Sequence, residues 1–439
     1  MACMARVLVV DDEPSTLLDM AENLERQGYL SLRARSPSQA LDIAGQAHPD
    51  VVVINAALAG GEGLDLGLSL KGAPATRHVP VILVGGAAPA AEVSAAVDGF
   101  VPASCREAEL ITRLHALVRL NTMRAELERR ARTAAKYGLE PSADLAPPAN
   151  VSDARVLVVA DGGGEAETVG KLLNGQTRLA FAASPFAALQ ELNARAYDAV
   201  VVMARGADSE ALDLCHDIRS NTRLYNTPVL VIVDADGYQD AELPYRRGAS
   251  DVLYRPLEGD EFRARTYSLV RLQRYRQAMQ ESYREAPDVA TNDSLTGLYS
   301  YGFLHEHLRR QIADAERWSK HLSLGFLDVA NIEAVNRAQG YAAGDRLLRQ
   351  IGRLMARLVR GEDLAARSGG KTFCVVLPET PEDIAVVALK RIAGVIDHTE
   401  FALPDSSEPV MVRLKVGRAG LEPGDAPTTL IARARARLE

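Results

Sequence analysis

The sequence predicts an α/β protein of three consecutive domains, the first two of them doubly wound. Its 439 residues are too many for a single hydrophobic core, and roughly 150 residues per domain gives about three domains. Short runs of β-branched residues alternate with segments whose apolar residues recur at helical spacing, which favours parallel sheets covered by helices. Segments of the first third of the chain return about 148 residues later, and repetition on this scale indicates duplicated domains.

The repeat has three parts, each of them a predicted strand. "ARVLVVDD" at 5–12 returns as "ARVLVVAD" at 154–161, "PDVVVINA" at 49–56 as "YDAVVVMA" at 197–204, and "VPVILV" at 79–84 as "TPVLVIV" at 227–233. Because these runs are apolar at nearly every position, we expect both faces of each sheet to lie under helices. The first doubly wound domain is predicted in residues 1–140 and the second in residues 153–284.

Each copy closes with a long charged helix. In the second copy, apolar side chains recur at three- and four-residue spacing: Leu269, Leu272, Tyr275, Met279 and Tyr283. This spacing predicts one apolar stripe, which either packs on its own domain or forms a dimer contact or a signalling linker. Two segments with Pro, at 141–152 and 285–293, are predicted linkers. Residues 285–439 then form a third α/β domain with a different pattern.

The composition is that of an ordinary globular protein. Hydrophobic residues make up 47% and charged residues 25% of the chain, and the formal net charge is -8. A negative net charge predicts no general attraction to nucleic acid or anionic lipid. No apolar run is long enough for a membrane span. The four cysteines (Cys3, Cys105, Cys215 and Cys374) show neither metal-ligand nor disulfide spacing, which predicts a cytoplasmic protein.

Acidic residues gather at predicted strand ends of the first copy. Asp11 and Asp12 follow the first strand, and Asn55 ends the third. With this pattern the first copy resembles the receiver domain of bacterial response regulators, which has a flavodoxin-like fold. The resemblance implies that the acidic pair holds Mg²⁺ and that Asn55 stands at the phosphoacceptor position. It also implies that Gly85 and Ala103 stand where the family has a Ser or Thr and a Lys that contact the phosphate.

These replacements predict a receiver domain that is not phosphorylated. An amide is a poor nucleophile, so Asn55 cannot form an acyl phosphate. Mg²⁺ prefers oxygen ligands, and Asp11 and Asp12 alone would hold it only weakly. We therefore expect no strong metal site here and interpret the acidic pair as the cap of a strand end.

The second copy departs further from the same pattern. Its acidic pair is reduced to Asp161 beside Ala160, and Met203 stands at the phosphoacceptor position. Val233 replaces the Ser or Thr, and Arg255 replaces the Lys. This domain is predicted to be an adaptor or dimerisation module and not a phosphoacceptor.

The third domain opens with "DSLTGLYS", continues with a strand that ends at Asp328, and includes the hairpin sequence "SGGKTF" at 368–373. These motifs, together with Asn336 and Asp345, resemble the GGDEF domain of diguanylate cyclases over nearly all of 293–439. That family makes cyclic di-GMP from two GTP with the help of two cations held by paired carboxylates. Glycines in the hairpin allow backbone conformations with positive φ.

Several positions that the resemblance assigns to this reaction are altered. Lys371 and Thr372 stand where the family has two acids after the glycines, so only Asp328 is left of the metal carboxylates. Glu333 replaces a phosphate-facing Lys, and Ser300 and Tyr301 replace an Asn and an Arg. An ammonium group repels the dications that should bind there, by on the order of several kcal/mol in a partly buried site. We therefore expect no catalysis and no catalytic cofactor.

An R-x-x-D motif survives five residues before the glycines. It consists of Arg360 and Asp363. In the GGDEF family an R-x-x-D at this distance is the inhibitory site for cyclic di-GMP, and the resemblance adds Arg391. An Arg fork can bond the O6 and N7 edge of guanine, and an Asp can accept from its N–H groups. The alternative is a surface ion pair worth less than about 1 kcal/mol.

The main hypothesis is a cyclic di-GMP effector that signals through its receiver domains to protein partners. The resemblance implies a homodimer and a role in cell-cycle or localisation control, including recruitment to a cell pole. One alternative is an active diguanylate cyclase, and a second is a scaffold that binds no nucleotide. A third is GTP acting as an allosteric ligand near Asp328, Asn336 and Asp345.

Overall fold

The structure is a computed structural model. It describes residues 5–86, 97–102, 107–139, 151–173, 177–205, 209–221, 223–234, 242–285, 291–403 and 409–438. Several predictions lie outside the described residues: those for Cys3, Cys105 and Ala103, and those for most of both linkers. The side chain of Tyr283 is also not described. Cys215 and Cys374 are free and buried.

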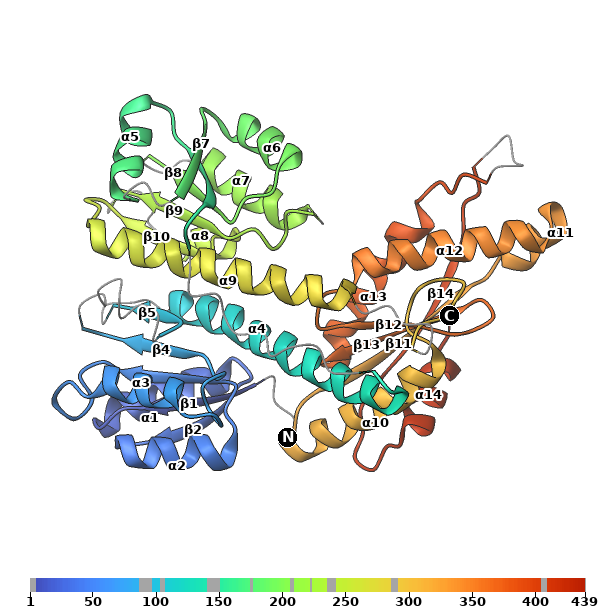
Figure 1. The fold of residues 1–439 in the computed structure, drawn as a ribbon, viewed down its shortest axis with the longest axis horizontal. Coiled ribbons are helices and arrows are strands. Elements are labelled where there is room, and N and C mark those ends of the chain that lie inside the picture. The colour runs from blue at the N-terminus through green and yellow to red at the C-terminus, as the bar shows by residue number, and fades with distance from the viewer. Residues whose placement is uncertain are drawn as a thin grey trace.

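The first domain is a doubly wound parallel sheet, as predicted. Its strands are β1 (Arg6–Val10), β2 (Leu30–Ala34), β3 (Val51–Asn55), β4 (Val81–Val84) and β5 (Gly99–Val101), in the order β2-β1-β3-β4-β5. Its helical segments are α1 (Pro14–Arg26), α2 (Pro37–Ala47), η1 (Leu58–Gly60), α3 (Gly63–Gly72), α4 (Glu107–Ala134) and η3 (Ala135–Tyr137). The central strands are buried on both faces because helices cover each side (Figure 1). Their side chains separate into two apolar clusters, one on each face.

The second domain repeats this topology. Its strands are β6 (Ala154–Val159), β7 (Thr177–Ala182), β8 (Ala199–Met203), β9 (Val229–Val233) and β10 (Asp251–Tyr254), in the order β7-β6-β8-β9-β10. Its helices are α5 (Gly163–Leu172), α6 (Pro185–Ala194), α7 (Ser209–Ser220), α8 (Leu243–Arg246) and α9 (Gly259–Glu285). The duplication predicted from the sequence is therefore a duplication of fold.

The third domain is an antiparallel sheet with helices on both faces. Its strands are β11 (Leu322–Val329), β12 (Leu364–Gly369), β13 (Thr372–Pro378) and β14 (Leu414–Gly420), in the order β12-β13-β11-β14. Its helices are α10 (Tyr301–Trp318), α11 (Ile332–Gln339), α12 (Tyr341–Leu358), α13 (Glu382–Asp397) and α14 (Pro427–Ala436). Phe326 and Phe373 are fully buried on opposite faces of this sheet, and each such ring stabilises the fold by about 1.5–3 kcal/mol.

The long helices α4 and α9 lie side by side between the first two domains, and α4 continues along α10 of the third (Figure 1). On α9, Leu272, Tyr275 and Met279 pack into the apolar cluster of the first domain, beside Leu114 and Leu117 of α4. The predicted stripe on α9 is thus divided. Leu269 packs against the apolar cluster of its own domain, as one alternative predicts, whereas the three residues after it are covered by the first domain of the same chain, a contact that neither alternative considered. No helix in the described residues is long and apolar enough to cross a membrane.

Candidate functional site

The hairpin "SGGKTF" forms between β12 and β13, as predicted. Gly369 and Gly370 have φ angles of 121° and 52°, which L side chains rarely adopt, so the turn favours glycine. β13 pairs with β11 in a register that places Thr372 opposite Asp328. The turn therefore brings Lys371 and Thr372 to the strand-end carboxylate.

Both oxygens of the Asp328 carboxylate are engaged by these two residues. The Thr372 hydroxyl donates to Oδ1 at 2.8 Å, and Lys371 Nζ lies 3.4 Å from Oδ2. Lys371 Nζ also donates to Glu333 at 2.8 Å, and this bond is the main reason that the pKa of Lys371 is raised. A dication beside Asp328 would meet an ammonium group and a neutral hydroxyl where carboxylates are needed. The residues present do not fit a pair of catalytic cations.

Four further motif positions lie in the third domain, of which Ser300 and Tyr301 are altered and Asn336 and Asp345 are retained. The Ser300 hydroxyl caps the N-terminus of α10, and Tyr301 follows with an exposed side chain. Asn336 packs so closely on α12 that a Cβ at Gly344 would lie 1.9 Å from its Oδ1. That Oδ1 is buried without a hydrogen-bond partner among the described residues, whereas Asp345 is exposed.

The R-x-x-D residues form a tight turn after α12. The Asp363 carboxylate accepts the Arg360 backbone N–H at 3.0 Å, and Arg391 on α13 donates to the Leu358 carbonyl at 3.3 Å. Arg391 therefore reaches the last turn of α12, two residues before Arg360. The fold thus places Arg391 beside the R-x-x-D turn, although the three residues lie on two different elements.

The Asp363 carboxyl is buried in this turn. Only 5% of the residue is exposed, and Oδ1 has no hydrogen-bond partner among the described residues. Burial, followed by the neighbouring Glu362 carboxylate, raises the pKa of Asp363 to about 7. Helix α4 covers the turn, because Arg130 donates to the Asp363 carbonyl at 2.8 Å and Arg119 donates to Glu362 at 2.9 Å.

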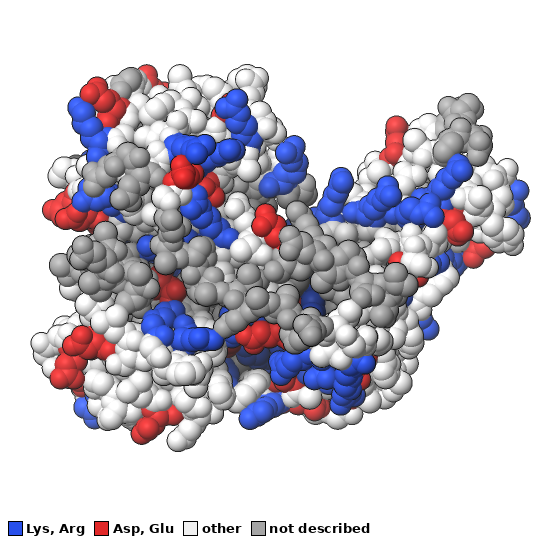
Figure 2. Space-filling model, in the orientation of Figure 1, with Lys and Arg blue, Asp and Glu red and all other residues white. Residues whose placement is uncertain are grey.

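A strip of positive charge on α12 leads to this turn. Its members are Arg346, Arg349, Arg353 and Arg357. Spacings of three and four residues place them on one side of the helix, where all but the half-buried Arg349 are exposed. Figure 2 shows positive charge along this helix. The overall net charge of -8 gives no indication of this strip. The three- and four-residue spacing of the arginines would have predicted it.

The acidic pair of the first domain is bonded to the Asn55 amide and to the backbone. The Asn55 amide donates to Asp11 at 3.1 Å, and Asp11 also accepts the Glu13 backbone N–H at 3.0 Å. Asp12 accepts the Ala59 backbone N–H at 3.2 Å. No group of three or more His, Cys, Asp or Glu in the described residues is arranged to hold a metal ion. The arrangement does not favour Mg²⁺, because the Asn55 amide directs its N–H toward the carboxylate that would bind the ion.

In the second domain, Arg255 fills the corresponding strand-end region. It donates to the Ala204 carbonyl at 2.7 Å and pairs with Asp234 at 3.1 Å and Glu165 at 3.4 Å. The sequence pattern points to Arg255 and Asp161, but no spacing in the sequence points to these two carboxylates, because they come from different segments. These ion pairs engage the Arg255 guanidinium with carboxylates of its own domain.

A buried polar cluster joins α4 to the third domain, and the sequence did not reveal it. Glu126 is fully buried and contacts His307 at 2.8 Å, Gln311 at 2.8 Å, Arg130 at 2.8 Å and Arg129 at 2.6 Å. Burial opposes ionisation of Glu126, but His307 and the two arginines outweigh it and hold the pKa of Glu126 far below its usual value. The cluster fixes the C-terminal half of α4 on α10.

Comparison with known proteins agrees with this architecture. A model of the response regulator receiver domain matches residues 7–115, and a model of the diguanylate cyclase GGDEF domain matches residues 290–439. The chain is 26% identical over 435 residues to the response regulator PleD of Caulobacter vibrioides. The matched region covers 98% of this chain and 95% of that protein.

Two further similarities each cover about a third of this chain. The chain is 30% identical over 145 residues to the diguanylate cyclase DgcP of Pseudomonas aeruginosa, covering 33% of this chain and 21% of that protein. The chain also matches a crystal structure of the GGDEF domain of DgcB from Caulobacter crescentus in complex with c-di-GMP, with 24% sequence identity and a TM-score of 0.33. This match covers 34% of this chain and 86% of that one.

Proposed function

We propose that this chain, in which two receiver-like domains precede a GGDEF domain, is an effector of cyclic di-GMP and not a cyclase. Its GGDEF domain would bind the nucleotide through Arg360, Asp363 and Arg391, and the receiver-like domains would pass the signal to a protein partner. One observation supports this most strongly: the hairpin ammonium of Lys371 lies against the Asp328 carboxylate, while the R-x-x-D turn keeps its residues together.

The loss of catalysis in this proposal follows from charge. Nucleotidyl transfer in this family needs two cations that bridge the triphosphate and activate a hydroxyl. Lys371 Nζ lies 3.4 Å from Asp328 and 2.8 Å from Glu333, so the ammonium already compensates the available carboxylates. Displacing it would cost both ion pairs, and a dication beside it would be repelled by on the order of several kcal/mol.

The binding step in this proposal couples the nucleotide to the receiver-like domains. The Arg360 fork suits the O6 and N7 edge of a guanine, and Asp363 suits its N–H donors. Asp363 is buried beneath α4, whose Arg119 and Arg130 hold the same turn. For its carboxylate to reach a guanine, these contacts must loosen. Ligand binding would then free α4, and with it the contact between the first and third domains.

Calorimetric titration of cyclic di-GMP into the full-length chain tests the proposal. We expect micromolar or tighter binding by the wild type and loss of binding in Arg360→Ala. Arg353→Ala is the matched control, because it removes an exposed arginine of α12 that lies seven residues before Arg360, and it should keep most of the affinity. Absence of binding by the wild type, or equal binding by wild type and Arg360→Ala, would contradict the proposed site.

Incubation with GTP and either Mg²⁺ or Mn²⁺ tests the other half of the proposal. We expect no cyclic di-GMP by chromatography, and its formation would identify the chain as a cyclase. Hydrogen exchange gives a further check, because ligand should increase exchange in α4 over residues 119–130 if the contacts with the turn loosen. Light scattering with and without cyclic di-GMP tests the homodimer that the family resemblance implies.

A further inference from the structure

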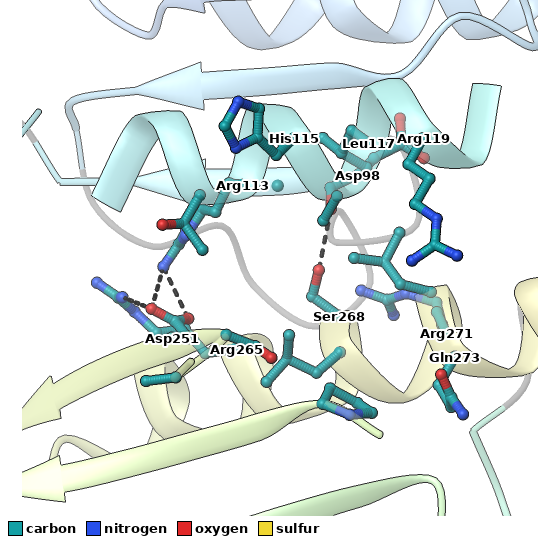
Figure 3. Close-up of a pocket in the computed structure, with 18 of the residues that line it drawn as sticks. Asp98, Arg113, His115, Leu117, Arg119, Asp251, Arg265, Ser268, Arg271 and Gln273 are labelled. Atoms are coloured by element: carbon teal, nitrogen blue, oxygen red, sulfur yellow. Dashed lines mark hydrogen bonds and ion pairs between the residues drawn. The ribbon is translucent and has the colours of Figure 1, made fainter. Parts of the chain in front are cut away.

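Strand β7 forms one edge of the sheet in the second domain. It pairs with β6 along one side, and in the part of the chain that the structure describes no strand pairs with its other side. The opposite edge, β10, lies against the first domain, because Arg113 of α4 bonds Asp251 of β10 at 2.7 Å (Figure 3). The backbone N–H and C=O groups along an open edge such as that of β7 can pair with an additional strand.

The two duplicated domains differ in the side chains of this edge. The strand registers place Arg33 of β2 at the position that Phe181 has in β7. Two residues earlier, Ser31 corresponds to Leu179. In the first domain both polar side chains bond the Glu25 carboxylate of α1, Arg33 at 3.1 Å. A polar row that is bonded within the first domain is therefore replaced by an apolar row in the second.

The apolar row of β7 is only partly covered by its own domain. Leu179 packs on an apolar cluster of the second domain, but 53% of Phe181 is exposed. Phe186, in the first turn of α6, is 71% exposed, and the first domain has Ser38 at this position after the same Ser-Pro start of a helix. Two exposed phenyl groups thus flank the corner between β7 and α6, and exposed apolar patches of this kind are typical of interaction sites.

The charged groups around this corner are paired with one another. Every charged residue of β7, α5 and α6 has an ion-pair partner in the same domain: Arg178 with Asp153, Glu165 with Arg205, Glu167 with Lys171 and Glu191 with Arg195. These three elements therefore offer no uncompensated charge to an ionic ligand. They favour a partner that is apolar where it meets Phe181 and Phe186.

The size of the surface favours a short segment of a partner over a second copy of this chain. The exposed parts of the two phenylalanines amount to roughly 250 Å², whereas a stable interface buries about 800 Å² on each partner. Strand β7 has 6 residues, enough to pair with a single extended segment. Segments that add to a sheet edge gain affinity from main-chain hydrogen bonds and specificity from alternate side chains.

We propose that β7 and the corner that follows it are a docking site for an extended segment of a protein partner, which adds to the sheet as a further strand. The segment would carry apolar side chains at alternate positions, because Leu179 and Phe181 are two residues apart and lie on the same face of the strand. This site gives the protein partner of the proposed function a place to dock, but it lies in the second domain and does not involve the R-x-x-D turn.

Fluorescence anisotropy on the full-length chain tests the site. The probe is a short labelled peptide in which valine and threonine alternate between two terminal lysines. We expect saturable binding of this peptide and no binding of the same peptide with a central proline, which lacks the N–H that a strand needs.

Phe181→Arg should weaken peptide binding about tenfold or more, because it removes the apolar contact. Its melting temperature should stay close to that of the wild type, since the first domain has Arg33 at the same position. Phe186→Ser is a second variant for the same loss. Tyr254→Ser is the matched control, because it removes an exposed aromatic side chain from the opposite edge of the same sheet, and it should bind the peptide as the wild type does.

Hydrogen exchange locates the bound peptide. Exchange should slow over residues 177–182 of β7 when the peptide binds, because pairing protects the outer N–H groups of the edge strand. Exchange over residues 30–34 of β2, the corresponding edge of the first domain, should not change.

Several outcomes would overturn the assignment. No binding by the wild type at millimolar peptide, equal binding by the wild type and Phe181→Arg, or equal binding of the proline peptide would each do so. A dimer in light scattering that Phe181→Arg abolishes would assign the surface to a second copy of the chain instead. Arg360→Ala should leave peptide binding unchanged, so a failure of this site is distinguishable from a failure of the proposed cyclic di-GMP site.

Discussion

The buried carboxyl of Asp363 makes the stability of the third domain depend on pH. Its pKa is raised from 3.8 to about 7 in the folded chain, so between these values the folded state holds a proton that the unfolded state has lost. Stability should therefore fall as pH rises through this window and level off above pH 7. Asp363→Asn removes the titration, and its amide oxygen can still accept the Arg360 N–H.

The size of the effect follows from the two pKa values. A tenfold change in an equilibrium constant corresponds to about 1.4 kcal/mol, so the stability of Asp363→Asn relative to the wild type should rise by roughly 3 kcal/mol between pH 4.5 and pH 8. Urea unfolding followed by tryptophan fluorescence measures this, because Trp318, the only tryptophan, lies at the end of α10 in the third domain.

If the stabilities of the wild type and Asp363→Asn change in parallel, within about 1 kcal/mol, across this pH range, the Asp363 carboxyl does not have a raised pKa in the folded chain. A second readout separates a ligand role from a structural one. If guanine N–H donors bind the ionised carboxylate, cyclic di-GMP binding by the wild type should release a proton near pH 6.5 and strengthen toward pH 8. Asp363→Asn should show neither effect.

Three other perturbations have defined outcomes. Glu126→Gln should destabilise the chain by about 3–5 kcal/mol in urea unfolding, because it leaves buried arginines without their counter-ion. The exposed Glu128→Gln should change stability by less than about 1 kcal/mol, and equal effects of the two substitutions would contradict the role of the buried cluster. Lys371→Glu combined with Thr372→Glu should create Mn²⁺-dependent thermal stabilisation that the wild type lacks, and Mn²⁺ stabilisation of the wild type would show that the hairpin ammonium does not exclude cations. Asn55→Asp should make the first domain bind Mg²⁺, seen by calorimetry, and an unchanged titration would mean that the strand-end amide is not what limits metal binding.

The sequence by itself determined the parts of this protein that depend on local spacing. Continuous β-branched runs predicted parallel strands, and their recurrence predicted two domains of one topology, which the matching strand orders confirm. The pair Gly369 and Gly370 predicted the hairpin because few other residues tolerate its backbone angles. Position relative to that hairpin then identified Lys371, Arg360 and Asp363, since each lies within ten residues of the turn.

Only the tertiary structure decided how the domains contact one another. Arg119 bonds Glu362 across 243 residues of sequence, and Glu126 bonds His307 across 181. Neither pair has a spacing that a helix or strand period could reveal. The same holds for a cavity of about 440 Å³ that is lined by residues of both receiver-like domains. Such sites depend on which surfaces of the chain meet. An apolar stripe such as that of α9 predicts that the helix will be covered, but it does not predict which surface will cover it.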